Sequence, residues 1–351
     1  MYSAGCAAGR KEDKRKPQEG TGRQKPTGAG RQGLKQVKIH CMTNPVTMQD
    51  VANVLLAVGA SPIMALDQKE AAEIARHSDA LLLNTGVPDD GKWAAWESAG
   101  LAAVQSGRPV VLDPVGAGAS HYRREGLSRL LQGVRPQLIR CNQAEAYALL
   151  GVKESVLNEQ APGMSEKRSG AESERNDADQ VRKFCGEACL QDGVDSSLRL
   201  SGAQSRTFAS ELAKRYGCAV LMSGEADVVS DGERTLSIGG GDARIRKITG
   251  GGCMLSALCA WRLAMGEEGF SAAVHAGRLW RAASAEAGRR TDSCGGGIGT
   301  FHVYLFDAVA KGMAGSGISA DPAMEDADAA KASVPFRAAA SNATAIHGDV
   351  I

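Results

Sequence analysis

Three consecutive glycines, Gly250-Gly251-Gly252, lead directly into a segment of helix-forming composition that runs from Cys253 to Ala264. Glycine lets backbone N–H groups approach a ligand closely, and the start of a helix attracts anions through its unpaired N–H groups and its dipole. An ionisable side chain at the first helical residue would face an anion bound there. The pattern therefore indicates a phosphate-transfer centre with Cys253 beside the reacting group. The alternative is a flexible loop that ends at a buried cysteine, because a glycine run alone is weak evidence.

Phosphoryl transfer also needs charge neutralisation and a metal ion. Asp113 and Glu145 are the carboxylates in loops that follow predicted strands, and Arg140 is a cation close to Glu145 in sequence. Carboxylates suit Mg²⁺, which nucleotide phosphates also hold. Each residue has a simpler interpretation: Glu145 as an acid in the first turn of a helix, and Arg140 as one half of a surface ion pair.

The segments that must position these residues alternate between short apolar runs and helical patterns from residue 37 onward. The expected strands are 37–42, 63–66, 80–83, 110–112, 138–139 and 218–222, and the expected helices between them are 46–58, 69–77, 92–105, 122–131, 144–150 and 207–216. A hairpin with a type I′ turn at Asp231-Gly232 is expected over 227–230 and 234–238, followed by helices 253–264, 272–287 and 300–310. This alternation predicts an α/β fold with a mostly parallel sheet covered by helices on both faces.

The expected strands end in small clusters of polar and turn residues. These clusters are Thr43-Asn44-Pro45, Asn84-Thr85-Gly86, Asp113 to Gly118 and Arg140-Cys141-Asn142. In open parallel sheets, ligands bind outside the carboxyl ends of the strands. Turn chemistry alone could place Asn and Gly at any one of these positions, but four clusters in succession favour a binding site along one edge of the sheet.

Three regions differ from this pattern. Residues 1–36 read as a disordered basic leader, the polar stretch at about 152–190 as a solvated insertion, and residues 312–351 as a flexible tail, which leaves one domain over 37–311. The formal net charge of +1 gives no reason to expect nucleic acid as a partner, and no apolar run is long enough to span a membrane. The nine cysteines, without metal-binding spacing, favour reduced thiols in the cytoplasm.

Four motifs in the expected order resemble the hydroxyethylthiazole kinase family of the ribokinase-like superfamily. They are His40 to Val46, Gly59 to Ala65, Leu112 to Ala117 and Thr249 to Cys253. The similarity covers roughly residues 37–151 and 193–310. It implies a ribokinase-like fold and phosphorylation of 4-methyl-5-(2-hydroxyethyl)thiazole by ATP with Mg²⁺, a salvage step toward thiamine. It further implies a homotrimer whose thiazole sites lie between subunits.

The resemblance also implies roles for individual residues. Substrate contacts fall on Asn44, Met64 and Gly250; nucleotide contacts on Arg140, Ser223, Gly224, Gly251 and Gly252; the metal on Asp113 and Glu145; and the catalytic role on Cys253. Family members usually have threonine where Ser223 stands, and most ribokinase-like kinases have aspartate where Cys253 stands. Without the resemblance, Met64 would be interpreted as a flexible side chain that fills space in the hydrophobic core.

A thiol at a helix start is expected to have a lowered pKa, and its thiolate could accept the alcohol proton, but an adjacent ATP would oppose the negative charge. Cys253 is therefore predicted to act as a modest base, with most of the rate enhancement coming from the amides of Gly250 to Gly252 and from Mg²⁺. Three alternatives remain open: a kinase of pyridoxal-type or sugar alcohols, an ATP-dependent dehydratase of hydrated nicotinamide nucleotides, and a non-enzymatic nucleotide-binding scaffold. The dehydratase would be expected to carry aspartate in place of Cys253.

Overall fold

The computed structural model describes residues 36–151 and 200–314. The predicted leader up to residue 35, the predicted insertion and the predicted tail from residue 315 onward lie outside these ranges. The last helix runs to Ala314, so the first residues assigned to the tail belong to a helix.

The described residues form one eight-stranded sheet with the strand order β2-β1-β3-β4-β5-β6-β7-β8. Its strands are β1 (Lys38–Met42), β2 (Ser61–Ile63), β3 (Ala80–Asn84), β4 (Val110–Asp113), β5 (Leu138–Asn142), β6 (Ala219–Ser223), β7 (Asp227–Ser230) and β8 (Thr235–Ile238). All pairings from β2 to β6 are parallel, whereas β7 and β8 are antiparallel to their neighbours. The mostly parallel sheet predicted from the sequence is confirmed.

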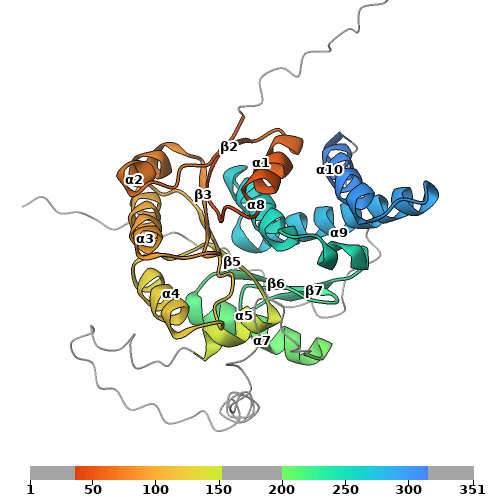
Figure 1. Ribbon diagram of the computed structural model, residues 1–351. Helices are drawn as coiled ribbons and strands as arrows, with labels where there is room; N and C mark the ends of the chain where they lie inside the picture. Colours follow the sequence, from red (N-terminus) through yellow and green to blue (C-terminus); the bar gives the residue numbers. More distant parts are fainter. Residues whose placement is uncertain (1–35, 152–199, 315–351) are drawn as a thin grey trace, which may run out of the picture. The chain divides into compact units, whose positions relative to one another are not determined.

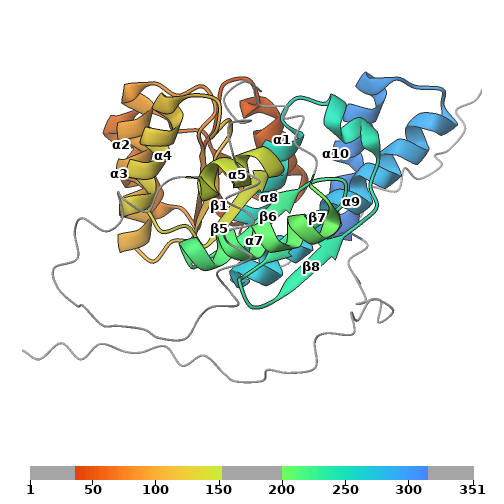
Figure 2. The same cartoon turned by 90° about the horizontal axis from the view of Figure 1, so that it is seen from below.

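Helices cover both faces of this sheet (Figures 1 and 2). One face packs against α2 (Gln68–His77), α3 (Asp90–Gln105), α4 (His121–Gly133), α5 (Gln143–Leu150) and α7 (Gly202–Tyr216). The other packs against α1 (Met48–Ala57), α8 (Gly251–Ala264), α9 (Gly269–Ser293) and α10 (Ile298–Ala314). The short 3₁₀-helix η2 (Ala243–Lys247) precedes α8. Each face therefore has its own hydrophobic core.

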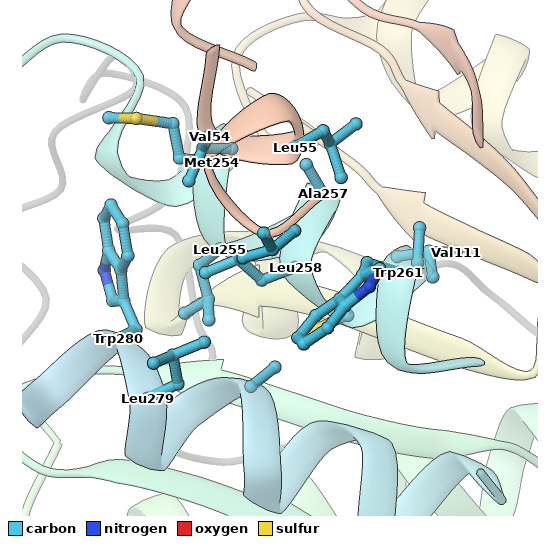
Figure 3. Close-up of a cluster of buried hydrophobic side chains, with 14 of the residues drawn as sticks. Val54, Leu55, Val111, Met254, Leu255, Ala257, Leu258, Trp261, Leu279 and Trp280 are labelled. Carbon is cyan, nitrogen blue, oxygen red and sulfur yellow. The ribbon is translucent and has the colours of Figure 1, made fainter. Parts of the chain in front are cut away.

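The central helix of the second face is α8, which is buried along almost its whole length. Its side chains Leu255 and Leu258 lie between residues of α1 and α9, and Val111 of β4 closes the same cluster (Figure 3). A helix that is apolar on all sides is stable only when other elements surround it. The packing therefore fixes the position of the glycine run at its start.

The alternation of side chains along the strands decides which residues face α8. In β3, Leu82 packs on the α8 side and Leu81 on the α3 side, so Asn84 points toward α8. The same alternation places three other strand-end residues on the α8 side. Asp113, Arg140 and Ser223 each lie two residues after a side chain of the α8-side core, namely Val111, Leu138 and Leu221. Four polar side chains thus reach one edge and one face of the sheet.

Two local predictions are wrong. Strand β2 ends at Ile63 rather than Leu66, because the backbone beyond it turns to another partner: the Ala65 carbonyl accepts a hydrogen bond from the His40 side chain at 2.8 Å. The hairpin has no type I′ turn, since Ser230 pairs with Thr235 and four residues form the loop. The Asp231 side chain stabilises that longer loop by accepting from the N–H groups of Glu233 and Arg234.

Candidate active site

Helix α8 begins at Gly251, after Gly250 in a left-handed conformation with φ of 83°. Its first intrahelical hydrogen bond runs from Met254 N–H to the Gly250 carbonyl at 2.8 Å. The three amides before it have no intrahelical acceptor and are free to bind an anion. The sequence predicted Cys253 as the first helical residue, but it is the third.

Close approach of other side chains requires two of the glycines. A Cβ on Gly250 would lie 2.8 Å from Thr47 Cγ2, in addition to the backbone conformation that disfavours a side chain. A Cβ on Gly252 would overlap the guanidinium group of Arg140. The missing side chain of Gly252 is therefore what lets Arg140 lie against the start of α8.

A chain of hydrogen bonds links neighbouring strand ends, as the polar clusters predicted. The Asn44 amide donates to Asn84 Oδ1 at 3.0 Å, and the Asn84 amide donates to Asp113 Oδ2 at 2.7 Å. The same Asn84 amide donates to Cys253 Sγ at 3.1 Å, and Ser256 Oγ donates to Asp113 Oδ2 at 2.9 Å. The first residues of α8 and the ends of β3 and β4 thus form one polar site.

Arg140 is a buried cation of this site and not a surface ion pair. Its Nη2 donates to Ser223 Oγ at 2.6 Å, and its Nη1 lies 3.8 Å from Asp113 Oδ1. Only 9% of the residue is exposed. Its position beside Gly252 places the positive charge where the helix start already favours an anion.

Glu145 uses both carboxylate oxygens within the protein. Oε1 accepts the Gly116 N–H at 3.0 Å, and Oε2 accepts the Asn142 N–H at 2.8 Å in a capping box at the start of α5. The interpretation as a first-turn acid therefore holds locally. Burial and the nearby Asp113 carboxylate nevertheless raise the pKa of Glu145, although the Arg140 charge and the two backbone hydrogen bonds act in the other direction.

Asp113 fits a cation. Its carboxylate is fully buried, and burial raises its pKa despite the nearby Arg140. Oδ2 accepts two hydrogen bonds, whereas Oδ1 has no hydrogen-bond partner among the described residues. Within residues 36–151 and 200–314, no three His, Cys, Asp or Glu side chains gather as a metal site. Mg²⁺ does not need such a cluster, since one or two carboxylates suffice when substrate phosphates complete its coordination.

A cleft of about 930 Å³ opens beside these residues. Of the residues predicted for the site, those that line it are Arg140, Glu145, Ser223, Gly224, Gly250, Gly251, Gly252 and Cys253. Asn44, Met64 and Asp113 are not among its lining residues. Asp113 is fully buried beside Arg140, and Asn44 Nδ2 lies 3.9 Å from Sγ of Cys253, which lines the cleft.

Met64 lies just beyond β2, the parallel neighbour of β1, and packs partly buried against the core on the α8 face. The hydrogen bond from His40 to the Ala65 carbonyl holds this segment next to β1. Met64 is therefore at the carboxyl edge of the sheet, two strands away from Asn84.

The expected low pKa of Cys253 is wrong for this structure. Burial, reinforced by the charge of Asp113, raises the pKa of the thiol to about 12. Hydrogen bonds from Thr47 and Asn84 oppose that shift without reversing it. Sulfur therefore keeps its proton at neutral pH.

Comparison with known proteins decides the family. Residues 34–159 and 168–313 match the Hydroxyethylthiazole kinase family. A hydroxyethylthiazole kinase of Lysinibacillus sphaericus (strain C3-41) is 35% identical over 275 residues, covering 78% of this chain and 92% of the relative. One of Clostridium botulinum (strain Eklund 17B / Type B) is 34% identical over 278 residues, covering 78% and 87%. The chain belongs to the hydroxyethylthiazole kinase family.

The present chain has the same fold as a solved hydroxyethylthiazole kinase from Pyrococcus horikoshii OT3. The two align with a TM-score of 0.60 and 28% identity over 79% of this chain and 88% of the other. The ribokinase-like fold expected from the motifs is thus confirmed. None of the helices in the described ranges is both long and apolar enough to cross a membrane.

Several residues of the candidate site were not assigned a role from the sequence. Asn84 belonged to a strand-end cluster but was given no function, and Ser256 follows Cys253 by three residues, a spacing that places both on one helix face. Asp227 and Arg281 form an ion pair that lines the cleft. Arg281 lies within a long helix and gave no local signal.

Proposed function

We propose that this protein transfers the γ-phosphoryl group of ATP to the hydroxyl of 4-methyl-5-(2-hydroxyethyl)thiazole. The observation that carries the proposal is that the α8 start and Arg140 line one cleft, while Arg140 also lies 3.8 Å from the buried Asp113 carboxylate, in a chain of this family. In the reaction the alcohol oxygen attacks the γ-phosphorus, the bond to the β–γ bridging oxygen breaks with its electrons going to ADP, and the alcohol proton is released to water.

The nucleotide phosphates fit the cleft beside α8. The amides of Gly251 and Gly252 and the guanidinium of Arg140 supply positive charge and hydrogen-bond donors on the same side. Ser223 and Gly224 line the adjoining wall, where Ser223 Oγ also holds Arg140 in place. Phosphoryl transfer depends mainly on such positioning and charge stabilisation.

The thiazole alcohol fits the opposite side of Cys253, toward Asn44, Met64 and Gly250. Asn44 approaches both Asn84 and Cys253, and Gly250 touches Thr47, so these residues surround the end of β1. The alcohol would then lie across Cys253 from the phosphates. That placement supports an in-line approach of the hydroxyl to the phosphorus.

Asp113 through Oδ1, with Glu145 nearby, would hold Mg²⁺ together with the nucleotide phosphates. When bound, the ion neutralises charge on the transferring phosphoryl group. Cys253 is protonated, so we assign it a small share of the rate enhancement and the larger share to the glycine amides, Arg140 and the cation.

We further propose a homotrimer in the cytoplasm. Among the described residues, Cys41, Cys141, Cys218 and Cys259 are free and buried, which agrees with a reducing compartment. Exposed apolar side chains on α1 and α10 provide a surface that a second subunit could cover.

The test is ADP release measured with the thiazole alcohol, pyridoxal and ribose as separate acceptors. We expect turnover with the thiazole alcohol and at least tenfold lower kcat/KM, about 1.4 kcal/mol, with the other two. Preferred turnover of pyridoxal or ribose would refute the acceptor, and no ADP release with any acceptor would refute the kinase.

Cys253 is tested in the same assay. Cys253→Ala should lower kcat by no more than about 100-fold, the lower end of the contribution of a general base. Cys253→Asp should retain or raise kcat, because a carboxylate accepts a proton without first having to ionise a buried thiol. Equal activity in all three proteins would remove Cys253 from the mechanism.

A further inference from the structure

Asn84, the last residue of β3, is fully buried and uses its whole amide within the protein. Its Oδ1 accepts from the Asn44 amide and from the Gly86 N–H, both at 3.0 Å. Its Nδ2 donates to Asp113 Oδ2 at 2.7 Å and to Cys253 Sγ at 3.1 Å. An asparagine amide offers two N–H groups and two lone pairs. Nothing remains with which Asn84 could bind a ligand.

We propose that Asn84 is a positioning residue. It holds in place both the side chains expected to contact the alcohol and the carboxylate expected to bind the metal ion. Its three side-chain partners are Asn44 in the loop after β1, Cys253 in α8 and Asp113 at the end of β4. This inference rests on the proposed kinase function and assigns a role within that site.

The bond to Asp113 determines which carboxylate oxygen is available. Asn84 and Ser256 both donate to Oδ2, so rotation of the carboxylate would break two hydrogen bonds in a fully buried place. Oδ1 is left without a hydrogen-bond partner in the described ranges, 3.8 Å from Arg140 Nη1. Asn84 thereby keeps one oxygen directed toward the place where the cation is expected.

The bonds to Cys253 and Asn44 set the acceptor side. Because Cys253 Sγ accepts from Asn84, the thiol hydrogen must point away from Asn84. Asn44 is held at both ends of its amide, since its Nδ2 donates to Asn84 and its Oδ1 accepts the Val46 N–H at 3.1 Å. Loss of Asn84 would release both groups that are expected to contact the alcohol.

The test compares Asn84→Leu, which keeps the shape of the side chain and removes all four hydrogen bonds, with Ser256→Ala, which removes one bond to Asp113 and one to the Gly252 carbonyl. We would measure kcat and KM for the thiazole alcohol, together with calorimetric Mg²⁺ affinity in the presence of a non-hydrolysable ATP analogue. Asn84→Leu should lower Mg²⁺ affinity and kcat, each by about 10- to 100-fold, and raise KM for the alcohol. Ser256→Ala should weaken Mg²⁺ binding and leave that KM unchanged.

The matched control is Gln137→Met. Gln137 Oε1 accepts the Val110 N–H at the opposite end of β4, so this variant loses a sheet-edge hydrogen bond far from the cleft. It should lower the melting temperature and leave the kinetic constants unchanged. If Asn84→Leu behaves in the same way, Asn84 has a purely structural role and the proposal is wrong.

Two outcomes separate this inference from the proposed function. Absence of kinase activity in the wild type would defeat the function, yet the Mg²⁺ affinities would still decide whether Asn84 positions Asp113. An active wild type with an equally active Asn84→Leu would defeat the inference alone. Should the leucine variant fail to fold, Asn84→Ala removes the same donors from a smaller side chain, and wild-type Mg²⁺ affinity in it would overturn the proposal.

Discussion

At the scale of single residues, the site depends on a missing side chain at Gly252. Gly252→Ala would push the Arg140 guanidinium away from α8 and from Ser223 Oγ. A hydrogen bond to a charged group is worth about 1.5–3 kcal/mol, so we expect kcat/KM for ATP to fall by about tenfold or more. Steady-state kinetics at varied ATP concentration would measure this loss.

Gly299→Ala provides the control for that substitution. Gly299 is the second residue of α10, as Gly252 is of α8, and a Cβ there would meet no atom within 4 Å. Kinetics should stay unchanged, and stability should be equal or higher by up to about 1 kcal/mol because alanine favours the helix. Equal kinetics in both alanine variants would contradict the role given to Arg140.

His40 makes stability depend on pH. The side chain is fully buried, and burial lowers its pKa below 6.5, although the hydrogen bond to the Ala65 carbonyl acts in the other direction. As the pH falls below about 6.5, the unfolded chain binds a proton before the folded chain does. The contribution of neutral His40 is therefore present above that pH and is lost below it, down to the folded pKa.

We expect the free energy of unfolding to fall more steeply for the wild type than for His40→Gln between about pH 7 and about pH 5, by at most about 1.4 kcal/mol per pH unit. Urea unfolding at several pH values would measure both slopes. His77→Gln is the control, because His77 is an exposed histidine at the end of α2. Parallel curves for wild type and His40→Gln would exclude His40 as the cause.

At the scale of elements, Arg281 connects α9 to the loops that form one wall of the cleft. Its guanidinium pairs with Asp227 of β7 through two hydrogen bonds. It also donates to three backbone carbonyls, those of Gly224, Glu225 and Gly240. The planar guanidinium fits all of these acceptors, whereas a lysine ammonium has only three donors.

Arg281→Lys should therefore lower the free energy of unfolding by about 1.5–3 kcal/mol and raise KM for ATP, because the wall that contains Gly224 loses its support. Denaturant unfolding and kinetics measure the two effects. Arg289→Lys on the same helix is the control: the Arg289 side chain is 70% exposed, and its pair with Glu286 should matter by no more than about 0.5 kcal/mol. A similarly small change for Arg281→Lys would refute the role of Arg281 in supporting the cleft wall.

The sequence predicted the order of strands and helices and the edge of the sheet that carries the site. It did not predict which face of the sheet carries the site, because strands such as β3 are apolar on both sides and show no alternation. That face became known only when Leu81 and Leu82 were found in different cores. Distant partners were equally hidden, since the contact between Arg281 and Asp227 joins residues 54 apart.

The pKa of Cys253 shows why local rules were insufficient. A helix start alone would lower the pKa of a thiol. Burial under neighbouring elements and the charge of Asp113 raise it instead, and neither follows from residues 249–264. Positions that depend on tertiary packing therefore need the structure, whereas the motif spacing was enough to identify the family.

At the scale of the whole molecule, the outer surface of α1 and α10 is the proposed contact between subunits. These helices pack against each other (Figure 1), and Leu56 and Val303 on them are 56% and 62% exposed. Val46, just before α1 and two residues after Asn44, is 67% exposed. The apolar surface thus adjoins the residues expected to contact the thiazole alcohol.

Val303→Glu should dissociate the proposed trimer, because a buried unpaired carboxylate at a subunit contact costs several kcal/mol. Light scattering should then give the mass of one chain. KM for the thiazole alcohol should rise if that site lies between subunits. Affinity for an ATP analogue should stay unchanged, since residues of one chain line the cleft.

Leu101→Glu tests whether the position of the charge matters. Leu101 is 41% exposed on α3, which covers the other face of the sheet, so the trimer should persist and both constants should stay at wild-type values. A trimeric Val303→Glu would move the contact away from α10. A monomeric Val303→Glu with unchanged KM for the alcohol would show that each chain holds a complete acceptor site, and the apolar side chains near Asn44 would then have no part in binding the thiazole.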